Sequence, residues 1–263
     1  MAVLTTMSGL LRSIDDLLRG RFTRREDLAD GRVEVPTPTL IGAGFLCGAV
    51  YGACMGIYAV LRPGEASVPQ LLATTVKVPL LFLLTLLVTF PSLYVVSALF
   101  DSKLRFQQTL RLLLAAMAAN LALLASFGPV TVFFTLSTES YPFMVLLNVV
   151  FFAVAGFTGL AFLRKALDAV FYVAEPETLP QPGAADEMDE GERMAPAPRR
   201  RYEPPPSRRI FTIWTFIYAI VGAQMGWILR PFIGNPDLPF TWFRERQSNF
   251  FQAVIAAVQD LVS

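Results

Sequence analysis

Three amide side chains lie deep in the long apolar stretches of this chain, and they are its first candidates for chemistry: Asn120, Asn148 and Gln224. The deep positions of the same stretches contain no Asp, Glu, Lys or Arg, although ionisable groups are the usual markers of transport paths inside a membrane. A buried amide can instead hydrogen-bond a neighbouring helix, which contributes about 0.6 to 2 kcal/mol. Two interpretations stay open: the amides join helices, or they line a polar permeation path.

The residues that catalysis usually requires are missing or isolated. The chain has no histidine, which removes the commonest general base and most haem and zinc sites. Its two cysteines, Cys47 and Cys54, stand about 10 Å apart along a helix, too far to bridge each other. Glu139, Ser140 and Tyr141 are adjacent but lack a partner base. No nucleotide-binding loop, CxxC or HExxH motif occurs, so we expect no enzyme, no cofactor and no metal site.

The elements that must position the amides are apolar runs long enough to cross a membrane, in a chain of 263 residues that is 54% hydrophobic. We predict five spans, at residues 39–61, 76–99, 110–127, 143–163 and 210–229, the third being the shortest. The expected fold class is all-α, a polytopic membrane protein with a five-helix transmembrane bundle and amphipathic surface helices at both termini. The segment 128–141, rich in aromatic and hydroxyl groups, should lie in the outer headgroup zone.

Four glycines recur at four-residue spacing through the first span, at Gly44, Gly48, Gly52 and Gly56. One face of this helix therefore has no side chains, which lets another backbone approach closely enough for dispersion to hold two helices together. The glycine face predicts a helix contact. It can serve packing within the chain's own bundle, or contact with a second copy or another membrane subunit.

The basic residues predict the orientation of the bundle. With the N-terminus on the cytoplasmic side, all but five of the 22 Lys and Arg fall in cytoplasmic segments, as the positive-inside rule favours. The exceptions are Arg62, Lys77, Arg230, Arg244 and Arg246. Lys77 and Arg111 are expected at span ends, where their side chains can reach the interface. No signal peptide precedes the first span, which should insert by itself.

The segments outside the spans complete the organisation. Residues 1–38 predict a cytoplasmic amphipathic helix and a linker, which bind either anionic lipid or a soluble partner. Residues 39–167 contain the first four spans, and 168–209, with many prolines and both charges, predict a disordered cytoplasmic linker. After the fifth span at 210–229, residues 230–263 form an external segment with prolines and aromatic residues and an interfacial helix. Arg230, Trp242 and Phe243 are its candidate interaction residues.

Three stretches carry a resemblance: PSLYVVSAL at 91–99, FFTLSTESYPFMVLLN at 133–148 and VGAQMGWILRPFIGNPDLPFTWFR at 221–244. They resemble a group of bacterial multi-span membrane proteins, some of which carry an actin-binding WH2 label. The resemblance implies a bacterial inner-membrane protein and no activity. The N-terminal segment lacks the basic LKKT-like stretch of a WH2 module. The five-span topology also looks like that of Yip1-type proteins, without their DLYGP-like motif.

These features favour a non-catalytic integral membrane scaffold, or an accessory subunit of a larger membrane complex, that packs through its glycine-faced helix. Its expected partners are the lipid bilayer and other membrane protein subunits or a second copy, with no nucleic acid. The alternative is a small-molecule or ion permease that uses the Asn and Gln side chains as a mid-membrane layer.

Overall fold

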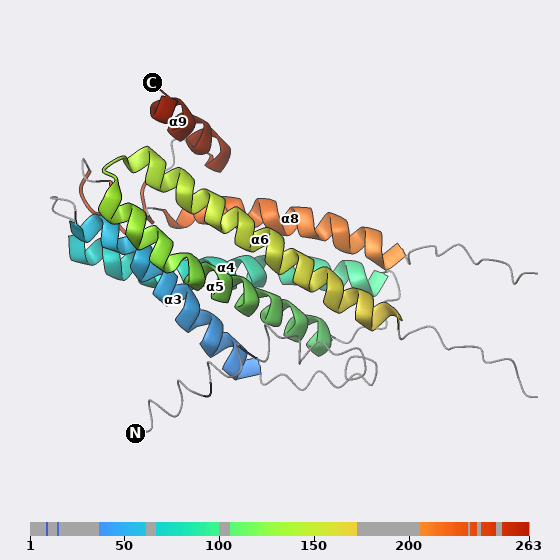
Figure 1. Ribbon diagram of the computed structural model, residues 1–263. Coiled ribbons are helices and arrows are strands. Elements are labelled where there is room, and N and C mark those ends of the chain that lie inside the picture. The colour runs from blue at the N-terminus through green and yellow to red at the C-terminus, as the bar shows by residue number, and fades with distance from the viewer. Residues whose placement is uncertain are drawn as a thin grey trace, which may run out of the picture.

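The computed structural model is all-helical over the residues it describes, which are 9, 15, 37–61, 67–99, 106–172, 206–230, 232–235, 238–245 and 249–262. This part of the chain forms six helices and no strands: α3 (Thr37–Leu61), α4 (Ser67–Leu99), α5 (Phe106–Ser137), α6 (Tyr141–Tyr172), α8 (Pro206–Leu229) and α9 (Phe250–Val262) (Figure 1). The predicted all-α class is confirmed. The predicted N-terminal amphipathic helix lies outside the described residues except for helical Gly9 and Asp15, and the linker at 168–209 lies outside them except for its two helical ends.

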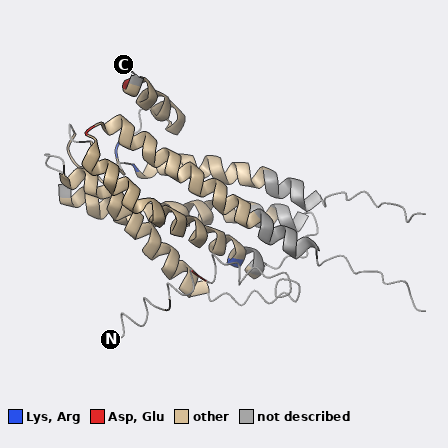
Figure 2. Ribbon diagram, viewed as in Figure 1, with Lys and Arg blue, Asp and Glu red and all other residues tan. Residues whose placement is uncertain are grey.

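Four of these helices are long and apolar enough to cross a membrane, over Thr37–Leu61, Val68–Ser92, Leu110–Ser137 and Tyr141–Leu163. In Figure 2 these helices are almost free of charged residues, and the blue and red positions gather at the ends of the bundle. The apolar parts of α8 and α9, Ile213–Leu229 and Phe250–Leu261, are shorter. The first four predicted spans therefore correspond to helices of membrane-spanning length and composition.

Helix α3 is central to the bundle. It packs along both α4 and α5, whereas α6 packs mainly on α5 and α8 mainly on α4 (Figure 1). The C-terminal helix α9 touches the bundle through α6 and α8. The chain therefore has a tightly packed centre of three helices and two peripheral long helices.

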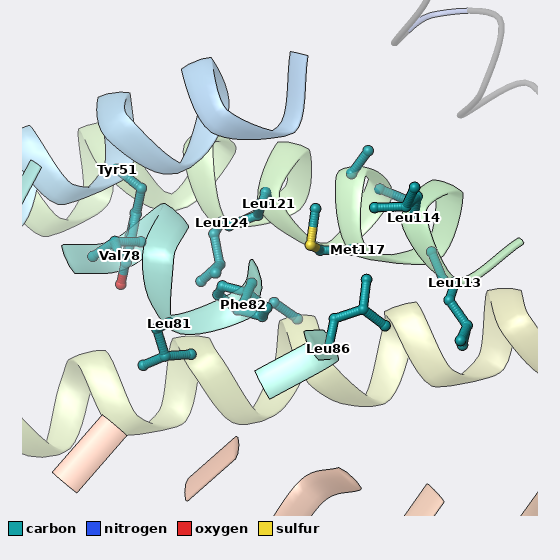
Figure 3. Close-up of a cluster of buried hydrophobic side chains, with 14 of the residues drawn as sticks. Tyr51, Val78, Leu81, Phe82, Leu86, Leu113, Leu114, Met117, Leu121 and Leu124 are labelled. Atoms are coloured by element: carbon teal, nitrogen blue, oxygen red, sulfur yellow. The ribbon is translucent and has the colours of Figure 1, made fainter. Parts of the chain in front are cut away.

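The apolar core lies where α3, α4 and α5 meet, and Figure 3 shows part of it. Tyr51 of α3 is fully buried, as are Val78 of α4 and both Leu121 and Leu124 of α5. Aromatic rings extend this core to α6, because Phe82 stacks on Phe152 at a centroid distance of 6.0 Å. In the most apolar stretch of α5, 61% of the residues are buried, whereas in that of α6 only 22% are buried. Helix α6 thus presents most of its surface outward.

Two of the predicted boundaries were wrong. Helix α5 continues to Ser137, so the segment from Gly128 that we expected in the headgroup zone is mostly helical. Pro129 lies inside this helix and removes one backbone donor, and the helix continues past it. Helix α4 begins at Ser67, nine residues before the predicted span. Lys77 is therefore ten residues inside a helix rather than at its end.

Candidate functional site

The glycine face of α3 is occupied by the chain's own helices. A Cβ atom added at Gly52 would lie 2.5 Å from Thr74 O, and one at Gly56 would lie 2.8 Å from Leu71 Cα, both on α4. Gly48 meets Pro79 Cβ at 3.0 Å, and Gly44 meets Ala118 Cα on α5 at 3.5 Å. Because Gly52 and Gly56 have no room for even a methyl group and Gly48 has little, the face works as a close helix contact inside the bundle. This is the first of the two uses that the sequence left open.

The three amides do not form one layer across the bundle. Asn120 Cβ lies 3.1 Å from a Cβ built at Gly159 of α6. Gly159 is eleven residues from Asn148 on the same helix, so the levels of Asn120 and Asn148 differ by about 16 Å along the axis of α6. Gln224 is half-buried on α8, which packs on α4 instead. The three amides therefore do not line one continuous polar path.

Asn148 of α6 connects its helix to α3 by a hydrogen bond. Its Oδ1 accepts a hydrogen bond of 2.7 Å from the hydroxyl of Tyr51, and its Nδ2 donates to Met144 O at 2.8 Å. Both side chains are buried. By contrast, Asn120 Oδ1 is buried without a hydrogen-bond partner. Asn148 therefore has the helix-joining role that the sequence allowed for, and the carbonyl of Asn120 does not.

The segment after α8 folds back over the end of the bundle where α4 begins. We call its described residues, 230, 232–235 and 238–245, the strap. The carbonyl of Phe232 accepts hydrogen bonds from Gln70 Nε2 at 2.9 Å and from Thr74 Oγ1 at 2.6 Å. The next two residues of the strap, Ile233 and Gly234, are buried. A Cβ at Gly234 would lie 2.8 Å from Ala59 Cβ, so the strap enters the gap between α3 and α4 where only glycine fits.

A second anchor of the strap is cationic. Lys77 is 2% exposed, and its ammonium donates to the carbonyl of Trp242. Side chains on a helix tilt toward its N-terminus, so the lysine stem runs toward the start of α4 and carries the charge out of the apolar centre. The same ammonium lies 5.8 Å from the ring centroid of Trp242 and 5.4 Å from that of Phe243. Both rings are more than half exposed.

Arg230 forms the third anchor, directly after α8 ends. Its guanidinium carbon lies 3.8 Å from the ring centroid of Trp227, and its Nη2 donates to the carbonyl of Glu245. Its Nε is buried without a hydrogen-bond partner. Partial burial, and then the nearby charge of Arg244, lowers the pKa of Arg230 from its usual value. Arg230, Trp242 and Phe243, chosen from the sequence, are therefore brought together, and Lys77 and Arg244 join them.

The connection between α5 and α6 lies at the same end of the bundle. Tyr58 donates its hydroxyl proton to the carbonyl of Glu139 at 2.9 Å. The hydroxyl of Ser140 accepts a hydrogen bond of 3.3 Å from Phe143 N and so caps the first turn of α6. Glu139 and Ser140 therefore have structural roles here, through a main-chain carbonyl and a hydroxyl.

Two features of the site were not found from the sequence, although both left a signal there. Gly222 and Gly226 of α8 pack on Thr85 and Leu81 of α4, with built Cβ distances of 3.5 and 3.4 Å, and their spacing is the small-xxx-small pattern. The polar residues Gln70, Thr74 and Lys77 stand at i, i+4 and i+7 and so share one face of α4. Such a stripe at the start of an apolar helix indicates a polar partner segment.

Comparison of the chain with family models, with curated proteins and with solved structures gives no match.

Proposed function

We propose that the protein is a non-catalytic membrane subunit or scaffold of a larger membrane complex. The observation that carries the proposal is the closed centre of the bundle. Backbone contacts at Gly48, Gly52 and Gly56 fill the space between α3, α4 and α5, and buried threonines such as Thr85 and Thr89 donate to carbonyls of their own helix. The centre of the bundle is closed by contacts among the described residues, and the bundle's exposed apolar faces are available to partners.

Five spans, rather than four, are part of this proposal. Residues later in α8 contact residues earlier in α4. Trp214 Nε1 donates to Thr89 O at 3.2 Å, Gly222 faces Thr85 and Gly226 faces Leu81. Helix α8 is therefore antiparallel to α4 and covers most of the same length. With 24 residues it is about 36 Å long, enough to cross the hydrocarbon layer of about 30 Å.

The proposed location is a bacterial inner membrane, with the N-terminus in the cytoplasm and the strap and α9 outside. The excess of Lys and Arg in the segments before α3, between α4 and α5, and between α6 and α8 supports this orientation. Both surface helices, at residues 1–38 and at α9, are proposed to lie in the interface with their apolar faces toward lipid.

Cysteine labelling tests the orientation. In a variant without Cys47 and Cys54, Ser248→Cys should react in intact cells with a membrane-impermeant maleimide. Ala185→Cys should react only with a permeant reagent. The reverse pattern would overturn the orientation and with it the assignment of the strap to the outside.

Photo-crosslinking tests the subunit role. A photoreactive amino acid at Phe157 or Phe216, which are 73% and 64% exposed on α6 and α8, should give a discrete adduct with one other membrane protein or with a second copy. The same amino acid at buried Leu121 is the matched control and should give none. If all exposed positions yield only lipid adducts and the purified monomer moves a solute into proteoliposomes, the permease replaces the scaffold.

The exposed rings of the strap test whether it takes part in the subunit contact. Changing Trp242 and Phe243 together to alanine should release a co-purified partner from the protein. Membrane insertion should stay intact, because both rings are exposed and the anchors of the strap there are backbone carbonyls. A partner that stays bound would confine the contact to α6 and α8.

A further inference from the structure

We propose that Arg230 and Arg244, supported by Lys77, form a binding site for the phosphate group of an anionic phospholipid at the membrane surface. The inference does not depend on the scaffold role, because a lipid site needs only the strap and its anchors. It assigns a ligand to the end of the bundle where the strap meets α4 and α8.

The geometry brings three cations to one short piece of chain. Lys77 binds the carbonyl of residue 242, and Arg230 binds the carbonyl of residue 245. Four consecutive residues extend at most about 10 Å between the first and last, so both cations lie close to this segment. Arg244 belongs to the segment itself and is half-buried. Figure 2 shows basic residues in the thin segment at this end of the bundle.

Arg230 donates its described hydrogen bond to the carbonyl of Glu245, which carries no net charge. The described carboxylates of the strap and of the connection between α5 and α6 belong to Glu245 and Glu139. Both are exposed. Arg244 acts on Arg230 as a like charge. Like charges held together beside an apolar layer repel, and an anion placed between them relieves that repulsion.

The chemistry of the side chains favours phosphate. A guanidinium offers a planar fork of donors that matches the oxygens of a phosphate, and Arg230 Nε is a buried donor without a partner in the protein. Stacking of Arg230 on Trp227 fixes the plane of the fork. The exposed rings of Trp242 and Phe243 are of the type that lies at headgroup level. A phospholipid fits both parts, since its phosphate meets the cations and its glycerol and chains meet the rings.

The test compares the full-length protein in three environments. These are nanodiscs of phosphatidylcholine, nanodiscs containing phosphatidylglycerol, and phosphatidylcholine nanodiscs with inorganic phosphate at matched ionic strength. Native mass spectrometry should show phosphatidylglycerol retained on the wild-type protein, and the unfolding midpoint should rise with this lipid but not with inorganic phosphate. Arg244→Gln should weaken retention about tenfold, the usual effect of losing a charge-assisted hydrogen bond, and Arg244→Lys should restore part of it.

The matched control is Arg111→Gln, which removes a half-buried arginine near the start of α5 and should leave lipid retention unchanged. In pure phosphatidylcholine, Arg244→Gln should unfold at the same temperature as wild type or higher, because it removes a repelling charge. A second variant, Arg230→Gln, should also lose lipid retention, but it removes a hydrogen bond that holds the strap and can fail to fold. Arg244→Gln then still tests the lipid site, because the Arg244 side chain makes no described hydrogen bond. Equal retention by wild type and Arg244→Gln would overturn the site, and an equal effect of inorganic phosphate would overturn its assignment to lipid.

Discussion

Helices α3 and α6 both carry glycine in the middle of an apolar run, but the two are surrounded differently. On α3, a methyl group at Gly52 would overlap the carbonyl of Thr74 at 2.5 Å. On α6, a methyl group at Gly156 would meet nothing within 4 Å. Glycine is therefore a condition for close packing at Gly52, whereas at Gly156 there is room for a side chain. A glycine in a membrane helix marks a contact only where a second backbone is near.

The largest expected effect separates these two glycines. Gly52→Ala should destabilise the protein by about 1 to 3 kcal/mol, because the new methyl group forces α3 and α4 apart. Gly156→Ala should be neutral or stabilising by up to about 1 kcal/mol, because alanine restricts the unfolded chain and favours helix. The measurement is the unfolding midpoint of both variants in the same bicelles. Effects of the same sign and size would mean that α3 does not touch α4 at this point.

The sequence predicted the helices better than it predicted their contacts. Runs of apolar residues gave the all-α class and the four long helices, because in a membrane every backbone polar group must be satisfied within its own helix. The prediction of spans from runs of apolar residues missed the first turns of α4, where Gln70 and Thr74 interrupt the apolar pattern. Both side chains donate to the carbonyl of Phe232, which is 162 and 158 residues away along the chain.

The candidate site shows the same limit. Arg230, Trp242 and Phe243 were predictable as an interface cluster from residue type and from their place after the last apolar run. Lys77 was expected at a span end and is instead ten residues inside α4, where it holds the strap. The three amides were grouped because each is polar and lies in the middle of an apolar run. The position of a residue within its own run does not determine which residues of a neighbouring helix lie beside it. Asn120 and Asn148 show this, since Asn120 of α5 lies beside Gly159 of α6, eleven residues along that helix from Asn148.

A second prediction concerns the polar contact that connects α3 with α6. Tyr51→Phe removes the donor to Asn148 Oδ1 and should cost about 0.6 to 1.7 kcal/mol, the range found for hydrogen bonds between membrane helices. The matched control is Asn120→Leu, which replaces a buried amide whose oxygen has no partner. Removing that acceptor should be neutral or stabilising. If Asn120→Leu costs more than Tyr51→Phe, then Asn120 makes a contact outside this chain.

The smallest expected effect comes from α8, whose two glycines have closer neighbours than Gly156 but more room than Gly52. Methyl groups at Gly222 and Gly226 would stand 3.5 Å from Thr85 Cγ2 and 3.4 Å from Leu81 Cδ1. These are near-ordinary contact distances, and the second neighbour is the flexible tip of a leucine. The double change to alanine should therefore alter stability by less than about 0.5 kcal/mol, since slight crowding offsets the gain in helix propensity.

Leucine at the same two positions gives the contrast for this prediction. Its larger side chains would push α8 away from α4 and break the contact of Trp214 Nε1 with Thr89 O, which should shift the fluorescence of this tryptophan toward that of a more exposed indole. A loss from the alanine pair as large as that from Gly52→Ala would mean that α8 approaches α4 as closely as α3 does. The tightly packed centre would then contain four helices instead of three, with α6 alone outside it.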